Sequence, residues 1–163
     1  MTETASAAHP RFNHARAAPG GYQAMLALEA FLHGCGLEPA LIHLVKLRVS
    51  QINGCAFCID MHWKDLRALG ESEQRLYSLD AWHECPWYSD RERAALRWAE
   101  AVTVLADGHV SDDVYLEVSR QFAEKDLASL TYVVATINAW NRLCIAARTP
   151  AGAYQPAKKP EEP

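Results

Sequence analysis

The sequence has no surplus of positive charge. Its 16 lysine and arginine residues are set against 20 aspartate and glutamate residues, which gives a formal net charge of -4 at pH 7. Nucleic acid as the main partner is therefore excluded, because phosphate binding requires a basic surface and no cluster of basic residues is present. Long apolar runs are also missing. The most apolar stretch, residues 130–147, is interrupted by Thr131, Asn138 and Arg142, so no membrane-spanning segment is expected.

The first residues, MTETASAAHPRFNHARAAPGG, lack the apolar segment of a secretory signal and carry an early charge at Glu3. We therefore expect a cytoplasmic protein in a reducing compartment. The chain has five cysteines, an odd number that a disulfide framework explains poorly in such a compartment. Two cysteines that lie close together in the sequence are thus expected to serve redox or metal chemistry.

Sustained period-two alternation is absent, so no β-sheet is expected. Apolar residues instead recur at spacings of three and four, in segments that end at glycine, proline or capping residues. This pattern predicts an all-α bundle of about six to seven helices with antiparallel neighbours. The expected helices cover about residues 22–33, 38–53, 55–69, 71–79, 89–106 and 126–148, with one more opening at Ser111 or Asp112.

The composition divides the chain into three parts. Residues 1–20 are small, polar and punctuated by proline and glycine, which predicts a mobile N-terminal arm. Residues 21–150 form the helical domain. Residues 151–163, AGAYQPAKKPEEP, hold three prolines and clusters of charge, which predicts a disordered C-terminal tail.

One group of residues carries chemistry: Cys55, Cys58 and His62 follow the spacing C-x-x-C-x-x-x-H at the start of a predicted helix. At about 100° per residue the three side chains fall on one narrow stripe of that helix. Free N–H groups and the positive end of the helix dipole stabilise a thiolate there. His62 lies one turn beyond Cys58, where it can exchange a proton with the thiol.

Two alternatives stand beside this redox interpretation. The cysteines could be buried structural thiols, or His43 on the preceding helix could complete a Cys2His2 metal site. Geometry counts against the metal site, because Cys55 and His62 are seven residues apart. That spacing corresponds to a helical rise of ~10 Å, whereas zinc–ligand bonds are only about 2.0–2.3 Å.

The remaining cysteines form no recognisable motif. Cys144 falls inside an apolar helix and is expected to be a small core residue, while Cys35 and Cys85 carry no prediction of chemistry. His33 and His83 could line a pocket, although for both we favour the interpretation that they are ordinary surface or core histidines without a functional role.

The stretch LVKLRVSQINGCAFCIDMHWKDLRALGES resembles the core motif of the carboxymuconolactone decarboxylase superfamily, on its alkyl hydroperoxidase D-like (AhpD-like) branch. Ser50-Gln51, Asn53-Gly54, the C-x-x-C-x-x-x-H unit and Lys64-Asp65 all fall as in that branch. The resemblance extends over about residues 20–150. It implies an all-α fold, assembly into trimers or hexamers, and the thiol-peroxidase branch, because the decarboxylases lack the paired cysteines.

By this resemblance, Cys58 is the peroxidatic cysteine, Cys55 the resolving cysteine and His62 the relay histidine. His43 marks a departure, because the family usually carries a glutamate as proton acceptor twelve residues before the first motif cysteine. A neutral imidazole can still accept a proton near pH 7, but it cannot pair by charge with a protonated His62. Phe57 is a second departure, since the best-known member has a histidine between its cysteines.

The implied mechanism is a thiol-dependent reduction of hydroperoxides. A Cys58 thiolate attacks the peroxide, becomes a sulfenic acid, and condenses with Cys55 to a disulfide. A lipoyl domain or a thioredoxin-like protein then reduces that disulfide, and no metal or flavin is needed. A redox-sensing or disulfide-exchange protein remains an alternative.

Overall fold

The computed structural model describes residues 9–157, with the side chain of residue 107 left aside, and within this range the regular secondary structure is helical throughout, without strands. Six helices of eight residues or more confirm the predicted all-α class. They are α2 (Pro19–His33), α3 (Pro39–Asn53), α4 (Ala56–Ala68), α6 (Asp90–Val104), α7 (Asp112–Ser119) and α8 (Glu124–Ala147). Shorter elements are α1 (His14–Ala17), α5 (Glu73–Tyr77), η1 (Leu79–Glu84) and η2 (Ala106–Gly108). In the described range no helix has the length and apolar character needed to cross a membrane.

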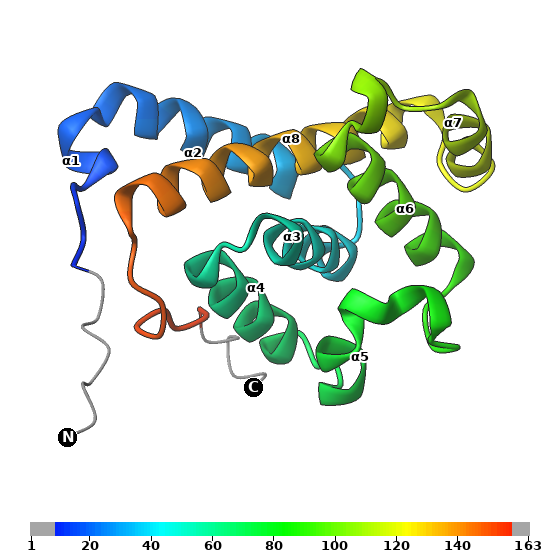
Figure 1. Ribbon diagram of the computed structural model, residues 1–163, viewed down its shortest axis with the longest axis horizontal. Coiled ribbons are helices and arrows are strands. Elements are labelled where there is room, and N and C mark those ends of the chain that lie inside the picture. The colour runs from blue at the N-terminus through cyan, green and yellow to red at the C-terminus, as the bar shows by residue number, and fades with distance from the viewer. Residues whose placement is uncertain (1–8, 158–163) are drawn as a thin grey trace.

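Helix α3 is buried on two faces and forms the centre of the bundle (Figure 1). Leu41, Val45 and Val49 belong to the larger apolar core, which α2, α4, α6 and α8 complete. Leu44 and Leu47 belong to a second, smaller core under α5 and η1. A helix that is apolar on two faces stays fixed by both cores, so the residues at its C-terminal end have a rigid base.

The helix ends follow the capping residues that the sequence supplies. Pro39 occupies the first turn of α3, where its missing N–H costs no hydrogen bond. Ser89 and Glu92 form the predicted capping box at the start of α6, and Ser111 caps α7. Gly54 ends α3 with a φ of 69°, a left-handed conformation that glycine adopts without steric cost.

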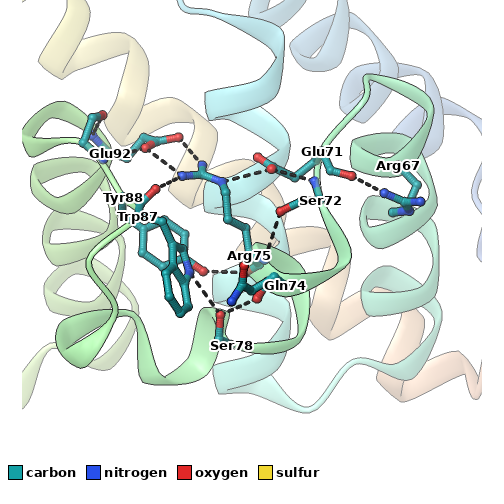
Figure 2. Close-up of polar contacts among 10 residues, drawn as sticks. Arg67, Glu71, Ser72, Gln74, Arg75, Ser78, Trp87, Tyr88 and Glu92 are labelled. Atoms are coloured by element: carbon teal, nitrogen blue, oxygen red, sulfur yellow. Dashed lines mark hydrogen bonds and ion pairs between the residues drawn. The ribbon is translucent and has the colours of Figure 1, made fainter.

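The irregular link between α5 and α6 is held together by Arg75 (Figure 2). Its guanidinium donates to Glu71 Oε1 at 2.9 Å and to the Glu92 carboxylate and the Trp87 carbonyl. The Tyr88 hydroxyl donates back to the Arg75 carbonyl. This network closes the side of the bundle that bears the second core and lies apart from the paired cysteines.

The described parts of both terminal segments pack on the bundle, which differs from the mobile arm and disordered tail expected from composition. Residues 14–20 enter α1 and α2, and the Arg11 N–H donates to the Ala147 carbonyl at 2.9 Å. After α8 the chain returns toward α4 (Figure 1), where Lys64 Nζ donates to the carbonyls of Gly152 and Tyr154, each at 3.0 Å. These contacts join the described parts of both segments to the bundle, and the mobility expected from composition stays a prediction. Residues 1–8 and 158–163 lie outside the described range.

Candidate active site

The turn between α3 and α4 places the paired cysteines at a helix N-terminus, as predicted. The Cys55 N–H donates to the Ser50 carbonyl at 3.0 Å, and Cys55 is the N-cap of α4. Cys58 lies in the first turn of α4 and His62 one turn further, and both are buried. The left-handed Gly54 is what lets the chain reverse so tightly between the two helices.

A half-buried amide, Asn53, and a buried one, Asn141, connect this turn to α8. Asn53 donates to Asn141 Oδ1 at 2.9 Å, and Asn141 donates to Ser50 Oγ at 3.0 Å. Ser50 Oγ in turn donates to the Lys46 carbonyl at 2.7 Å. These polar residues satisfy one another in the core, and their network fixes where Cys55 lies.

Three sulfurs, not two, meet at this point. Cys55 Sγ and Cys58 Sγ lie 2.6 Å apart, and Cys144 Sγ from α8 lies within 4.8 Å of both. Cys144 is buried, as expected of a core residue, but its contact with the motif cysteines was not predicted. No local sequence signal could reveal it, because only the packing of α8 on α4 brings it there.

The contacts among the three thiols shift their pKa values in different directions. Hydrogen bonds from Cys144 and Cys58 lower the pKa of Cys55 to about 3. The contacts with Cys144 and Cys55, together with burial, raise the pKa of Cys58, and the contact with Cys55 raises that of Cys144 to about 11. The lowered pKa favours a thiolate on Cys55, and the raised pKa of Cys58 means that this thiol needs a base to become a nucleophile.

A second polar group, formed by residues of α3 and α4, lines the same cavity as Cys58 and Cys144. His43 Nδ1 lies 3.2 Å from His62 Nδ1, and Asp65 Oδ2 lies 3.5 Å from the first and 3.7 Å from the second. The Tyr154 hydroxyl donates to Asp65 Oδ1 at 2.6 Å. The predicted neighbours His43 and His62 thus come together, and Asp65 and Tyr154 join them.

Sequence reasoning gave Asp65 and Tyr154 no role in the site. Asp65 follows His62 by three residues, so helical spacing alone could have placed both side chains on one face of α4. Tyr154 offered no such signal, because it belongs to a segment whose composition indicated a tail.

Burial keeps both imidazoles neutral near pH 7. It lowers the pKa of His43 to about 4, with a further contribution from His62, and it also lowers the pKa of His62. Burial acts oppositely on the carboxyl of Asp65, but hydrogen bonds from His62 and Tyr154 outweigh it and lower the pKa of Asp65. His62 Nε2 is buried and has no hydrogen-bond partner in the described part of the chain, so it is free to accept a proton.

Both groups open on a cavity of about 1180 Å³ between α2, α3, α4 and the two terminal segments. Cys58 and Cys144 line it, whereas Cys55 does not. Its walls are mostly apolar, and they include Leu26, Leu32, Leu37, Ile42, Met61 and Leu69. One buried ion pair also lines it: Lys46 Nζ donates to Glu29 Oε2 at 2.6 Å, and Trp140 Nε1 donates to Glu29 Oε1 at 2.9 Å.

The other histidines and cysteines lie apart from these two groups. His33 is exposed and lines the cavity without joining either group. His83 stacks on Trp82 and faces Glu100, far along the chain from the motif. Cys85 donates weakly to the Ala81 carbonyl inside the second core, and Cys35 lies in the larger core.

Comparison with known proteins identifies close relatives of the chain. YdfG of Bacillus subtilis (strain 168), an uncharacterized protein, is 41% identical over 136 residues, which cover 83% of this chain and 92% of YdfG. A crystal structure of ATU0492 from Agrobacterium tumefaciens is 40% identical, with a TM-score of 0.86 over 90% of this chain and 100% of that one. ATU0492 is of unknown function, and its name connects it with the antioxidant defence protein AhpD.

The fold also occurs in a debrominase. The debrominase Bmp8, solved with 2,3,4-tribromopyrrole, is 16% identical with a TM-score of 0.72, over 85% of this chain and 74% of Bmp8. At that identity the likeness concerns the fold alone.

The sequence profile of the Carboxymuconolactone decarboxylase family matches residues 16–101, a stretch that includes Cys55, Cys58, His62, His43 and Asp65. Together with the YdfG and ATU0492 relationships, this match shows that the chain belongs to the carboxymuconolactone decarboxylase family, on its AhpD-like branch.

Proposed function

We propose that the protein is a thiol-dependent peroxidase that reduces hydroperoxides through Cys58 and Cys55. The observation that carries the proposal is the pairing of the two sulfurs, 2.6 Å apart, with Cys58 on the wall of a large cavity. A nucleophile that can be reached from the cavity and a second thiol in contact with it are the two groups that this reaction requires.

The first step begins when His62, one helical turn beyond Cys58 on α4, takes the proton of the Cys58 thiol. The Cys58 thiolate then attacks the nearer peroxide oxygen, the O–O bond breaks, and the departing alkoxide takes a proton to leave as an alcohol. Cys58 is thereby oxidised by two electrons to a sulfenic acid. The His62–His43 contact of 3.2 Å offers a route by which the proton can leave His62 or return to it.

The second step closes the cycle on the protein. The Cys55 thiolate attacks the Cys58 sulfenic sulfur, a disulfide forms and water leaves. An external dithiol, such as a lipoyl domain or a thioredoxin-like protein, then reduces the disulfide by thiol–disulfide exchange and is itself oxidised. The reducing cytoplasm that the sequence suggested is the compartment in which such a dithiol is available.

The substrate class that suits the cavity is an organic hydroperoxide with an apolar body. The cavity that Cys58 lines has leucine, isoleucine and methionine side chains in its walls, which favour burial of a hydrocarbon group. Hydrogen peroxide has no such group to bury and gains nothing from these walls.

The experiment that tests the proposal counts free thiols before and after treatment with an organic hydroperoxide. A purified sample treated with one equivalent of an organic hydroperoxide should lose two free thiols and yield one equivalent of alcohol. Mass spectrometry should then show the disulfide on a peptide holding Cys55 and Cys58. If thiols are lost only to a disulfide donor and never to a peroxide, the protein is a disulfide-exchange or redox-sensing protein instead.

We also propose a homo-oligomer built on α2 and α8. Phe31 of α2 and Tyr132 of α8 contact each other edge to face, with 5.6 Å between ring centroids, yet 48% and 53% of their surfaces stay exposed. An apolar aromatic pair on the surface of a helical bundle is typical of an interface.

A further inference from the structure

We propose that His43, His62 and Asp65 bind a divalent metal ion of the zinc type, separate from the three sulfurs. The two Nδ1 atoms and Asp65 Oδ2 are separated by 3.2, 3.5 and 3.7 Å. Zinc bonds of about 2.0–2.2 Å in a tetrahedral arrangement separate neighbouring ligand atoms by roughly 3.3–3.6 Å. The three atoms thus already stand at the corners of one face of such a tetrahedron.

The charge of Asp65 supports a cation at this place. No lysine or arginine of the described residues forms an ion pair with Asp65, and its only ion-pair partners there are His43 and His62. Two Nδ1 atoms 3.2 Å apart can hold only one proton between them. A single proton can form a hydrogen bond between only two of the three atoms His43 Nδ1, His62 Nδ1 and Asp65 Oδ2. A metal ion can accept a lone pair from all three.

The surroundings resemble those of a built metal site. The Tyr154 hydroxyl donates to the other oxygen of Asp65, as outer-shell donors do for carboxylate ligands. His43, His62 and Asp65 all line the cavity, so the fourth position is open to water or to a small anion. Three protein ligands with one open position are the arrangement of catalytic zinc sites.

The thiols are not part of this set. Cys55, Cys58 and Cys144 form a cluster of their own, and no sulfur shares the 4.8 Å grouping of the two histidines and Asp65. The site therefore differs from a Cys2His2 centre. Because a metal at the Nδ1 atoms occupies the lone pairs that the proposed relay uses, its binding is expected to slow the proposed peroxidase. That consequence rests on the proposed function, whereas metal binding itself does not.

The test measures Zn²⁺ binding by isothermal titration calorimetry in a chain without the sulfur cluster. The variant Cys55→Ser/Cys58→Ser/Cys144→Ser has no peroxidatic thiol, so binding is measured independently of any peroxidase activity. We expect one Zn²⁺ per chain. Adding His43→Gln or Asp65→Asn should lower the affinity by more than the 10–100-fold typical of outer-shell changes. His33 lines the same cavity but is not one of the three proposed ligands. His33→Gln should therefore leave the affinity for Zn²⁺ unchanged.

Two results would overturn the site: no binding to the folded sulfur-free variant, or equal binding after His43→Gln. Circular dichroism establishes that each variant is folded. If the sulfur-free variant does not fold, Co²⁺ is bound to the unaltered chain. Nitrogen and oxygen ligands then give visible d–d bands without thiolate charge transfer, whereas intense near-ultraviolet charge transfer would place the metal on the sulfurs and contradict the proposal.

Discussion

Cys58 lines the cavity, but its sulfur is the one whose proton is held more tightly, while Cys55, 2.6 Å away, carries the lower pKa. Access from the cavity therefore favours Cys58 as the nucleophile, whereas the lower pKa favours Cys55. The helix dipole and hydrogen bonds favour a thiolate on Cys55, and the dipole contributes about 0.3–2 kcal/mol. General-base assistance by His62, one turn beyond Cys58 on α4, contributes ~10²–10⁴-fold, or about 3–5 kcal/mol, which outweighs the dipole. Access from the cavity, which Cys55 lacks, also favours Cys58 as the sulfur that attacks.

Our first prediction follows: Cys58→Ser abolishes peroxide turnover, whereas Cys55→Ser still consumes about one equivalent. Stopped-flow consumption of an organic hydroperoxide measures both. Sulfenic-acid trapping with a dimedone reagent should label Cys58 in the Cys55→Ser/Cys144→Ala protein, in which no other thiol of the cluster can react with the sulfenic acid. Labelling of Cys55 in the Cys58→Ser protein, with Cys58 inert in the converse variant, would reverse the assignment.

The second prediction concerns the unexpected third sulfur. Because Cys144 lies within 4.8 Å of Cys58, it can resolve a sulfenic acid when Cys55 is absent. After peroxide treatment, Cys55→Ser should therefore yield a Cys58–Cys144 disulfide, which peptide mass spectrometry detects. The double variant Cys55→Ser/Cys144→Ala should instead accumulate the sulfenic acid. A stable sulfenic acid in the single variant would show that Cys144 takes no part.

The third prediction tests whether His43 occupies the slot of the family's glutamate. Its contact with His62 places it where a proton acceptor is needed. His43→Glu should raise the peroxidase rate severalfold, because a carboxylate stabilises His62 as a cation and a neutral imidazole does not. His43→Gln keeps a similar size without a basic group and should lower the rate. Metal-free buffer with a chelator separates these effects from metal binding, and equal rates in both variants would count against a relay through position 43.

The fourth prediction addresses assembly. Sedimentation at micromolar concentration should show a species larger than the 18.1 kDa monomer. Tyr132→Glu places a charge in the exposed aromatic pair and should shift the distribution toward monomer. Tyr77→Glu introduces the same charge at a residue that is 69% exposed and distant in sequence, so it should leave the assembly intact. A monomer in the unaltered chain would refute the oligomer.

The fold and the paired-cysteine motif could be predicted from the sequence because their signals are local. Apolar spacing and capping residues determine each helix, and C-x-x-C-x-x-x-H places three side chains on one face of α4. His43 was considered from the residues alone only as a possible metal ligand, and its place beside His62 in a proton relay came from the resemblance, which carries information on packing between helices. Cys144 and Tyr154 were missed because each reaches the site through the course of α8 and the segment after it, which no local pattern encodes. The tail composition of residues 151–163 even pointed away from Tyr154, whose order depends on contacts with α4.

The last prediction is a loss of stability in acid that His43 causes. Burial is the main reason that the pKa of His43 falls from 6.5 to about 4, and the charges of His62, Lys46 and His33 act in the same direction, against Asp65. Because the folded state binds fewer protons than the unfolded state between these values, the free energy of unfolding decreases as the pH falls below 6.5. At pH 5 the contribution of His43 to this loss is about 2 kcal/mol.

Urea unfolding at pH 7.5 and pH 5, with a chelator present, measures this effect. His43→Gln cannot take up the proton, so its stability should fall by about 2 kcal/mol less than that of the unaltered chain between the two pH values. His83→Gln is the matched control, since the His83 side chain is 51% exposed beside Glu100 and its burial cannot drive such a loss. An equal acid loss in the His43→Gln protein and the unaltered chain would mean that His43 is solvated enough to titrate normally. The buried, neutral pair of His43 and His62, on which the proposed proton relay depends, would then not exist in solution.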